Sequence, residues 1–122
     1  MEGAMEIGRQ LVMLNRELAL ERVGGDQGLL QEVARLFLDD LGRSLNEIEQ
    51  AITLGDAQRL EREAHSLKGS VANFGAEPVV RAALALEQIG RRGALAEAPS
   101  SLALLKQLLA ELEPELASLA RS

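Results

Sequence analysis

The sequence has no cysteine, no tryptophan and no tyrosine, and each absence excludes a class of function. Without cysteine there can be no disulfide and no thiolate chemistry, and a zinc ion would have to be held by one histidine and carboxylates. Phe37 and Phe74 are the only aromatic residues, so side chains that stack on bases or sugars are missing. The core must therefore be built from aliphatic side chains.

Basic residues and long apolar runs are also scarce. Lys and Arg total 13 against 19 Asp and Glu, which gives a formal net charge of -6 and disfavours a nucleic-acid backbone or an anionic membrane as partner. The longest uninterrupted apolar run, 82–86, is far shorter than the roughly 18 residues that suggest a membrane span. The N-terminus lacks the basic start of a signal peptide. We expect a cytoplasmic protein with neither nucleic acid nor membrane as partner.

What is present favours helices. The 122 residues have the length of one domain, and Leu and Ala together make up about a third of them, whereas β-branched residues are few. Apolar residues spaced three and four apart predict helices at about 16–23, 27–54, 57–74 and 78–92, with a last helix starting near Ser100 or Ser101. Because all connectors are short, we predict an all-α fold, an up-and-down antiparallel four-helix bundle with a short additional N-terminal helix.

Local signals mark the expected ends of these helices. Gly90 and Gly93 are both interpreted as terminators of the fourth helix, and Pro114 is expected to kink the last helix or to split off its last turn. Residues 1–14 are expected to be a leader or an extension of the first helix, ahead of a domain at 15–122.

The one histidine, His65, lies about 140° around its predicted helix from the centre of the apolar stripe, so it should face water. Gly69 follows one turn later and also points away from the core, where packing gives no reason to omit a side chain. A neutral imidazole nitrogen can act as a nucleophile, and Lys68 would disfavour a positive ring and neutralise a bound phosphoryl group. These residues suit a phosphoryl acceptor. The alternative is an incidental surface histidine paired with Glu61.

The context of His65 resembles a known family. The stretch at 64–76, AHSLKGSVANFGA, is similar to the signature of histidine-containing phosphotransfer (HPt) domains, which relay phosphoryl groups in two-component signalling. The likeness extends over about 15–120, through LFLDD at 36–40, the Gly-Asp before the histidine helix, and Leu86-Glu87. It implies a four-helix bundle with the phosphorylated histidine exposed in mid-helix. The apolar periodicity independently predicts the bundle and the outward position of His65.

Roles follow from the resemblance by position. His65 would be the phosphorylated residue, Lys68 the cation that neutralises the phosphate, and Gly69 the residue that keeps access open. Glu87 stands where the family often has a Gln or Glu that hydrogen-bonds near the imidazole, but it could equally be a solvated charge at the edge of the buried stripe. Ser70 also matches, although its helical phase predicts a position nearer the core and a bond back to the carbonyl of Ser66.

The resemblance implies a carrier without kinase activity of its own, since no nucleotide-binding motif occurs. It implies no cofactor or metal bound by this chain, with Mg²⁺ in the partner receiver domain. The expected partners are response-regulator receiver domains and a hybrid sensor histidine kinase, and the expected state is a monomer. Two alternatives stay open: a helical adaptor without covalent chemistry, and the phosphotransfer domain of a chemotaxis-type kinase.

Overall fold

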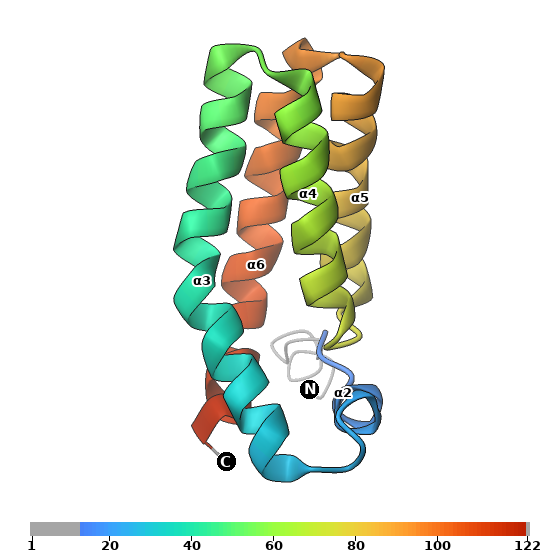
Figure 1. The fold of residues 1–122 in the computed structure, drawn as a ribbon, viewed down its shortest axis with the longest axis vertical. Helices are drawn as coiled ribbons and strands as arrows, with labels where there is room; N and C mark the ends of the chain where they lie inside the picture. Colours follow the sequence, from blue (N-terminus) through green and yellow to red (C-terminus); the bar gives the residue numbers. More distant parts are fainter. Residues whose placement is uncertain (1–12, 122) are drawn as a thin grey trace, which may run out of the picture.

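The protein is a bundle of antiparallel helices, shown in Figure 1 by a computed structural model that describes residues 13–121. The helices are α2 (Arg16–Arg22), α3 (Gln27–Leu54), α4 (Ala57–Ala72), α5 (Glu77–Arg92) and α6 (Ala98–Arg121), with a 3-10 turn at Leu95–Glu97. The long helices form a ring in which α3 packs against α4 and α6, and α5 packs against α4 and α6. The predicted four-helix bundle with an additional short helix is confirmed.

Short polar residues start three of these helices. Asn15, Asp26 and Asp56 each accept a hydrogen bond from the backbone N–H three residues further on, at 3.0 to 3.1 Å. These bonds satisfy backbone donors that have no partner inside the helix. The predicted starts of α2, α3 and α4 are therefore correct, because the signal that sets them is local.

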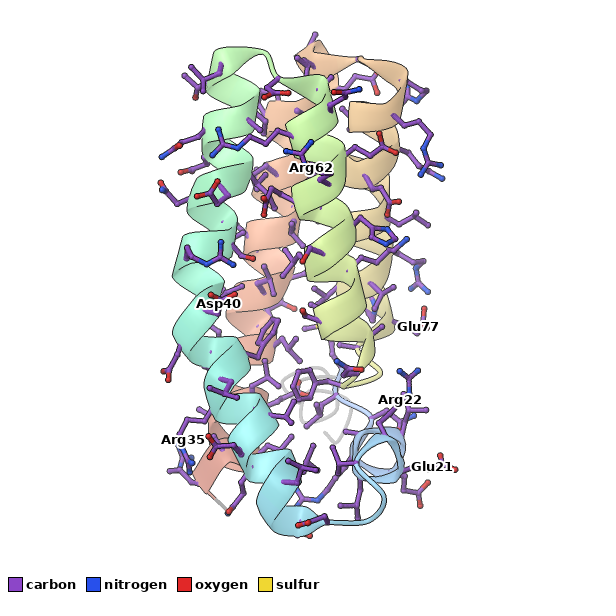
Figure 2. The ribbon with its side chains drawn as sticks, in the orientation of Figure 1. Glu21, Arg22, Arg35, Asp40, Arg62 and Glu77 are labelled. Carbon is purple, nitrogen blue, oxygen red and sulfur yellow. The ribbon has the colours of Figure 1, made fainter. Side chains whose placement is uncertain are left out.

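The core between the long helices is aliphatic, as the composition requires. Leu and Ala dominate the buried side chains, and the largest include Leu60, Leu86 and Leu105. The two aromatic residues meet at one end of this core, where the rings of Phe37 and Phe74 are 5.6 Å apart in an edge-to-face arrangement. Charged side chains such as Arg35, Asp40 and Glu77 lie on the outside (Figure 2).

Helix α2 lies across one end of the bundle and is tied to it at its beginning (Figure 1). The backbone N–H of Asn15 donates to the carbonyl of Phe74 at 2.8 Å. Gly75 has a φ of +64°, and a Cβ there would meet Asn15, so both the left-handed backbone and the close approach favour glycine. The Glu115 carboxylate of α6 accepts hydrogen bonds from the backbone N–H groups of Met13 and Leu14 at 2.8 to 3.1 Å.

Several predicted boundaries are wrong in detail. Gly90 is not a terminator: it lies inside α5, where a Cβ would be 2.7 Å from the backbone nitrogen of Glu61, so glycine is needed for helix contact. Helix α6 starts at Ala98 rather than near Ser100, and it continues past Pro114 to Arg121, so its last turn is not split off. Met13 and Leu14 precede α2 without being helical, and the rest of the predicted leader, 1–12, lies outside the described residues.

Candidate functional site

His65 lies on the outer face of α4. Its neighbours Ala64 and Leu67 are buried on the inner face and fix the rotation of the helix, while the His65 side chain is 67% exposed. The predicted orientation of the histidine is therefore correct. A nucleophile in this position is open to a partner from the solvent side.

Glu87 reaches the His65 ring from α5. Its side chain is only 5% exposed, and its Oε2 lies 3.0 Å from His65 Nδ1. Its Oε1 is buried and forms an ion pair with Lys68 Nζ at 2.7 Å, without the directed geometry of a hydrogen bond. Of the two interpretations that the sequence left open, the structure places Glu87 against the imidazole and not in solvent.

The charge on Glu87 follows from this environment. Burial by itself would raise the pKa of the carboxyl group, but Lys68 and His65 outweigh burial and hold the pKa below its ordinary value of 4.5. Glu87 is therefore ionised at neutral pH. An ionised carboxylate only accepts hydrogen bonds, so the hydrogen between Glu87 and the ring belongs to His65 Nδ1.

Arg91 is a component of the site that the sequence did not single out. Its Nη2 donates to Glu87 Oε2 at 3.1 Å, and its Nε donates to Glu61 Oε2 at 2.9 Å, so it joins α5 to α4. These three side chains line a pocket of about 410 Å³ with His65 and Arg62. Arg62 lies on the side of α4 that faces the viewer in Figure 2. The spacing of four between Glu87 and Arg91 was the available signal.

Gly69 and Ser70 follow the histidine on α4. A Cβ built on Gly69 would meet no atom within 4 Å, which agrees with the prediction that packing does not require glycine there. Ser70 is exposed, so the prediction that it lies nearer the core is wrong. It lines a groove between α3 and α4 together with Phe37 and Phe74.

Metal-binding clusters and membrane-spanning helices are absent from the part of the chain that the structure describes. Residues 13–121 contain no cluster of three or more His, Asp or Glu side chains that could hold a metal ion. None of the helices in this range is long and apolar enough to cross a membrane.

The family model of the Hpt domain matches residues 32–115 of the sequence. The chain belongs to the Hpt domain family. Within the matched range lie His65, Lys68, Gly69, Glu87 and Arg91. The Hpt assignment rests on sequence, and it agrees with the helical bundle and the exposed histidine.

Individual proteins resemble this Hpt domain as well. Histidine-containing phosphotransfer protein 2 of Oryza sativa subsp. japonica is 40% identical over 75 residues, which are 58% of this chain and 45% of the rice protein. The chain thus matches about half the length of that curated relative. The crystal structure of histidine-containing phosphotransfer protein B (HptB) from Pseudomonas aeruginosa PAO1 superposes with a TM-score of 0.83. That match has 24% sequence identity and covers 92% of this chain and 97% of HptB, which shows a common fold.

Proposed function

We propose that this Hpt domain carries phosphoryl groups in a phosphorelay. His65 accepts a phosphoryl group from the aspartate of a receiver domain, or from a kinase, and passes it to the receiver domain of a response regulator. The observation that carries the proposal is the contact of the exposed His65 ring, through Nδ1, with a buried and ionised Glu87. The family match and the names of the matched rice and Pseudomonas proteins support it.

The hydrogen bond to Glu87 sets the reactive nitrogen in this proposal. Because Nδ1 carries the hydrogen, the lone pair of the neutral ring is on Nε2. Since Nδ1 is hydrogen-bonded to Glu87, Nε2 is the ring nitrogen available to a partner. Glu87 thereby acts as a positioning residue, which fixes both the tautomer and the ring orientation before the partner arrives.

The transfer step keeps that proton in place. Nε2 attacks the phosphorus of an aspartyl phosphate, the bond between phosphorus and the aspartate oxygen breaks, and the carboxylate leaves with the electron pair. The ring then carries a hydrogen on Nδ1 and phosphorus on Nε2, and its positive charge faces the Glu87 carboxylate. Lys68, which is 25% exposed beside Glu87, supplies positive charge near the arriving phosphate.

The reaction also requires access to the ring and groups that belong to the partner domain. Gly69 leaves room for the partner domain to approach the ring, since nothing occupies the position of its missing side chain. The Mg²⁺ ion of the reaction is assigned to the receiver domain, and this chain contributes position and charge. It acts as a carrier rather than as a kinase.

The test is to mix the full chain with a panel of phosphorylated receiver domains and Mg²⁺, and to compare it with His65→Gln. We expect an acid-labile, base-stable phosphate on the wild-type protein and none on the variant. A folded wild-type protein that takes phosphate from no receiver would contradict the carrier role. A signalling output that persists in His65→Gln would instead indicate an adaptor that works without covalent chemistry.

A further inference from the structure

One oxygen atom in the site serves two donors. Oε2 of Glu87 lies 3.0 Å from His65 Nδ1, and it accepts a hydrogen bond from Arg91 Nη2 at 3.1 Å. Arg91 and the imidazole therefore compete for the same lone-pair density. The Arg91 side chain is 61% exposed, so it can be removed without opening the core.

From this shared oxygen we infer that Arg91 sets the lifetime of the phosphoryl group on His65, acting through Glu87. The inference rests on the proposed function and deepens it. Arg91 is a positioning residue in this scheme, since it touches the carboxylate and not the reacting atoms.

The chemistry of phosphohistidine explains why the carboxylate matters. In hydrolysis a water oxygen bonds to phosphorus, the bond from phosphorus to Nε2 breaks, and the electron pair returns to Nε2. The protons of the water remain with the released inorganic phosphate or pass to solvent. The ring leaves as neutral imidazole only while Nδ1 holds its hydrogen. An anion beside Nδ1 keeps that hydrogen in place and so makes the phosphoryl group more labile.

Arg91 weakens this effect because its positive charge offsets part of the negative charge on the carboxylate oxygen that faces Nδ1. The other charged groups around the carboxylate come from the same two helices. Lys68 pairs with Oε1, Glu61 binds the Arg91 guanidinium, and Arg62 lines the pocket. In the described residues α3 and α6 bring no charged partner to Glu87. Because Lys68 stays in place, Glu87 remains ionised when Arg91 is removed.

The experiment measures phosphohistidine hydrolysis against pH. The full-length wild type, Arg91→Ala and Arg92→Ala are phosphorylated chemically with phosphoramidate, which transfers its phosphoryl group to Nε2 and releases ammonia, so no cognate receiver is needed. Arg92 is the matched control, because it is the next residue of α5 and pairs with Glu97 instead. We expect the pH midpoint of hydrolysis to rise by about half to one unit in Arg91→Ala, which is roughly a three- to tenfold faster loss above the wild-type midpoint. Arg92→Ala should behave as wild type.

Two further variants make the test specific. Arg91→Ala in a Glu87→Gln background should cause no additional shift, because a neutral amide has no charge for Arg91 to weaken. Glu61→Gln combined with Arg91→Ala should keep the shift, which excludes the released Glu61 carboxylate as its cause.

The outcomes separate this inference from the proposed function. Identical pH profiles for wild type and Arg91→Ala would overturn the proposed role of Arg91 and leave the carrier function standing. The same would follow if Arg91→Ala shifted the pH midpoint equally in the Glu87→Gln background. A wild-type protein that forms no phosphohistidine with phosphoramidate or with any receiver would overturn the carrier function itself.

Discussion

Gly69 is a residue whose identity the packing of the fold does not explain. Its missing side chain would meet no atom within 4 Å, although it lies inside α4. Gly69→Ala should therefore raise the free energy of unfolding by about 0.5 to 1 kcal/mol, since alanine is the better helix former. Gly69→Glu should slow phosphoryl transfer from a receiver at least tenfold, because bulk and negative charge would stand beside His65. Urea unfolding and transfer kinetics measure the two effects.

Gly42 provides the matched control for both changes. It also lies in a helix interior with open space around its missing side chain. It is seven residues from both Arg35 and Glu49, which contact α6, so it lies on the α6 side of α3. Gly42→Ala should stabilise similarly, whereas Gly42→Glu should leave transfer unchanged. Equal transfer by Gly69→Glu and Gly42→Glu would contradict the access role.

The sequence predicted the groups on α4 better than those that reach it from α5. The phase of the apolar stripe places His65 on the outer face, and that phase is a local property. The burial of Glu87 was left open because it depends on how close α5 comes to α4. Arg91 was missed for the same reason: whether its side chain reaches Glu61 of α4 as well as Glu87 depends on the spacing between the helices.

At the scale of the helices, Gly90 sets the distance between α4 and α5. A Cβ there would be 2.7 Å from the Glu61 backbone nitrogen and 2.9 Å from the Ala57 carbonyl oxygen, and neither atom can move alone. Gly90→Ala should therefore lower the free energy of unfolding by about 1 to 3 kcal/mol in spite of the better helix propensity. It should also weaken the contact of Glu87 with His65. Urea unfolding of Gly90→Ala, compared with that of Gly42→Ala, measures the change in stability. A Gly90→Ala variant that is more stable than the wild type would contradict the close approach of α4 and α5 at this residue.

Most helix ends could be predicted because caps are short-range features, and the errors at Gly90 and at the start of α6 involve glycine or proline. Pro99 lies in the first turn of α6, where proline needs no N–H partner, so the helix starts earlier than its serines suggested. Pro114 removes one backbone hydrogen bond, yet Leu112 and Leu116 are fully buried on either side and hold the helix together. The sequence shows the proline but not the packing that offsets it.

For the molecule as a whole, Glu87 links stability to pH. It is the one charged side chain that is buried in the described residues, and its pKa is lowered in the folded state. A lowered pKa stabilises the fold above the ordinary value of 4.5, and this contribution is lost as the pH falls through the folded-state pKa. Glu87→Gln should therefore lower the free energy of unfolding by about 1 to 3 kcal/mol at pH 7.

The difference between wild type and Glu87→Gln should shrink as the pH falls below 4.5 and through the lowered pKa of Glu87, because the wild-type carboxyl group then becomes protonated as well. Urea unfolding of both proteins across this pH range measures the difference in free energy of unfolding. The titration of the exposed carboxylates affects both proteins equally and cancels in this difference. A difference that stays constant with pH would show that the charge of Glu87 contributes nothing to stability.

Among residues 13–121, every side chain that forms a hydrogen bond or ion pair with His65, Glu87 or Arg91 belongs to the α4–α5 pair, between Glu61 and Arg91. Helices α3 and α6 contribute the apolar surfaces that cover this pair. Mutation can therefore exchange one aliphatic side chain for another in α3 and α6 over evolutionary time without displacing the reactive groups. The reactive groups thus depend on the residues of one helix pair, whereas α3 and α6 need only keep an apolar pattern, and the same fold occurs in HptB at 24% sequence identity.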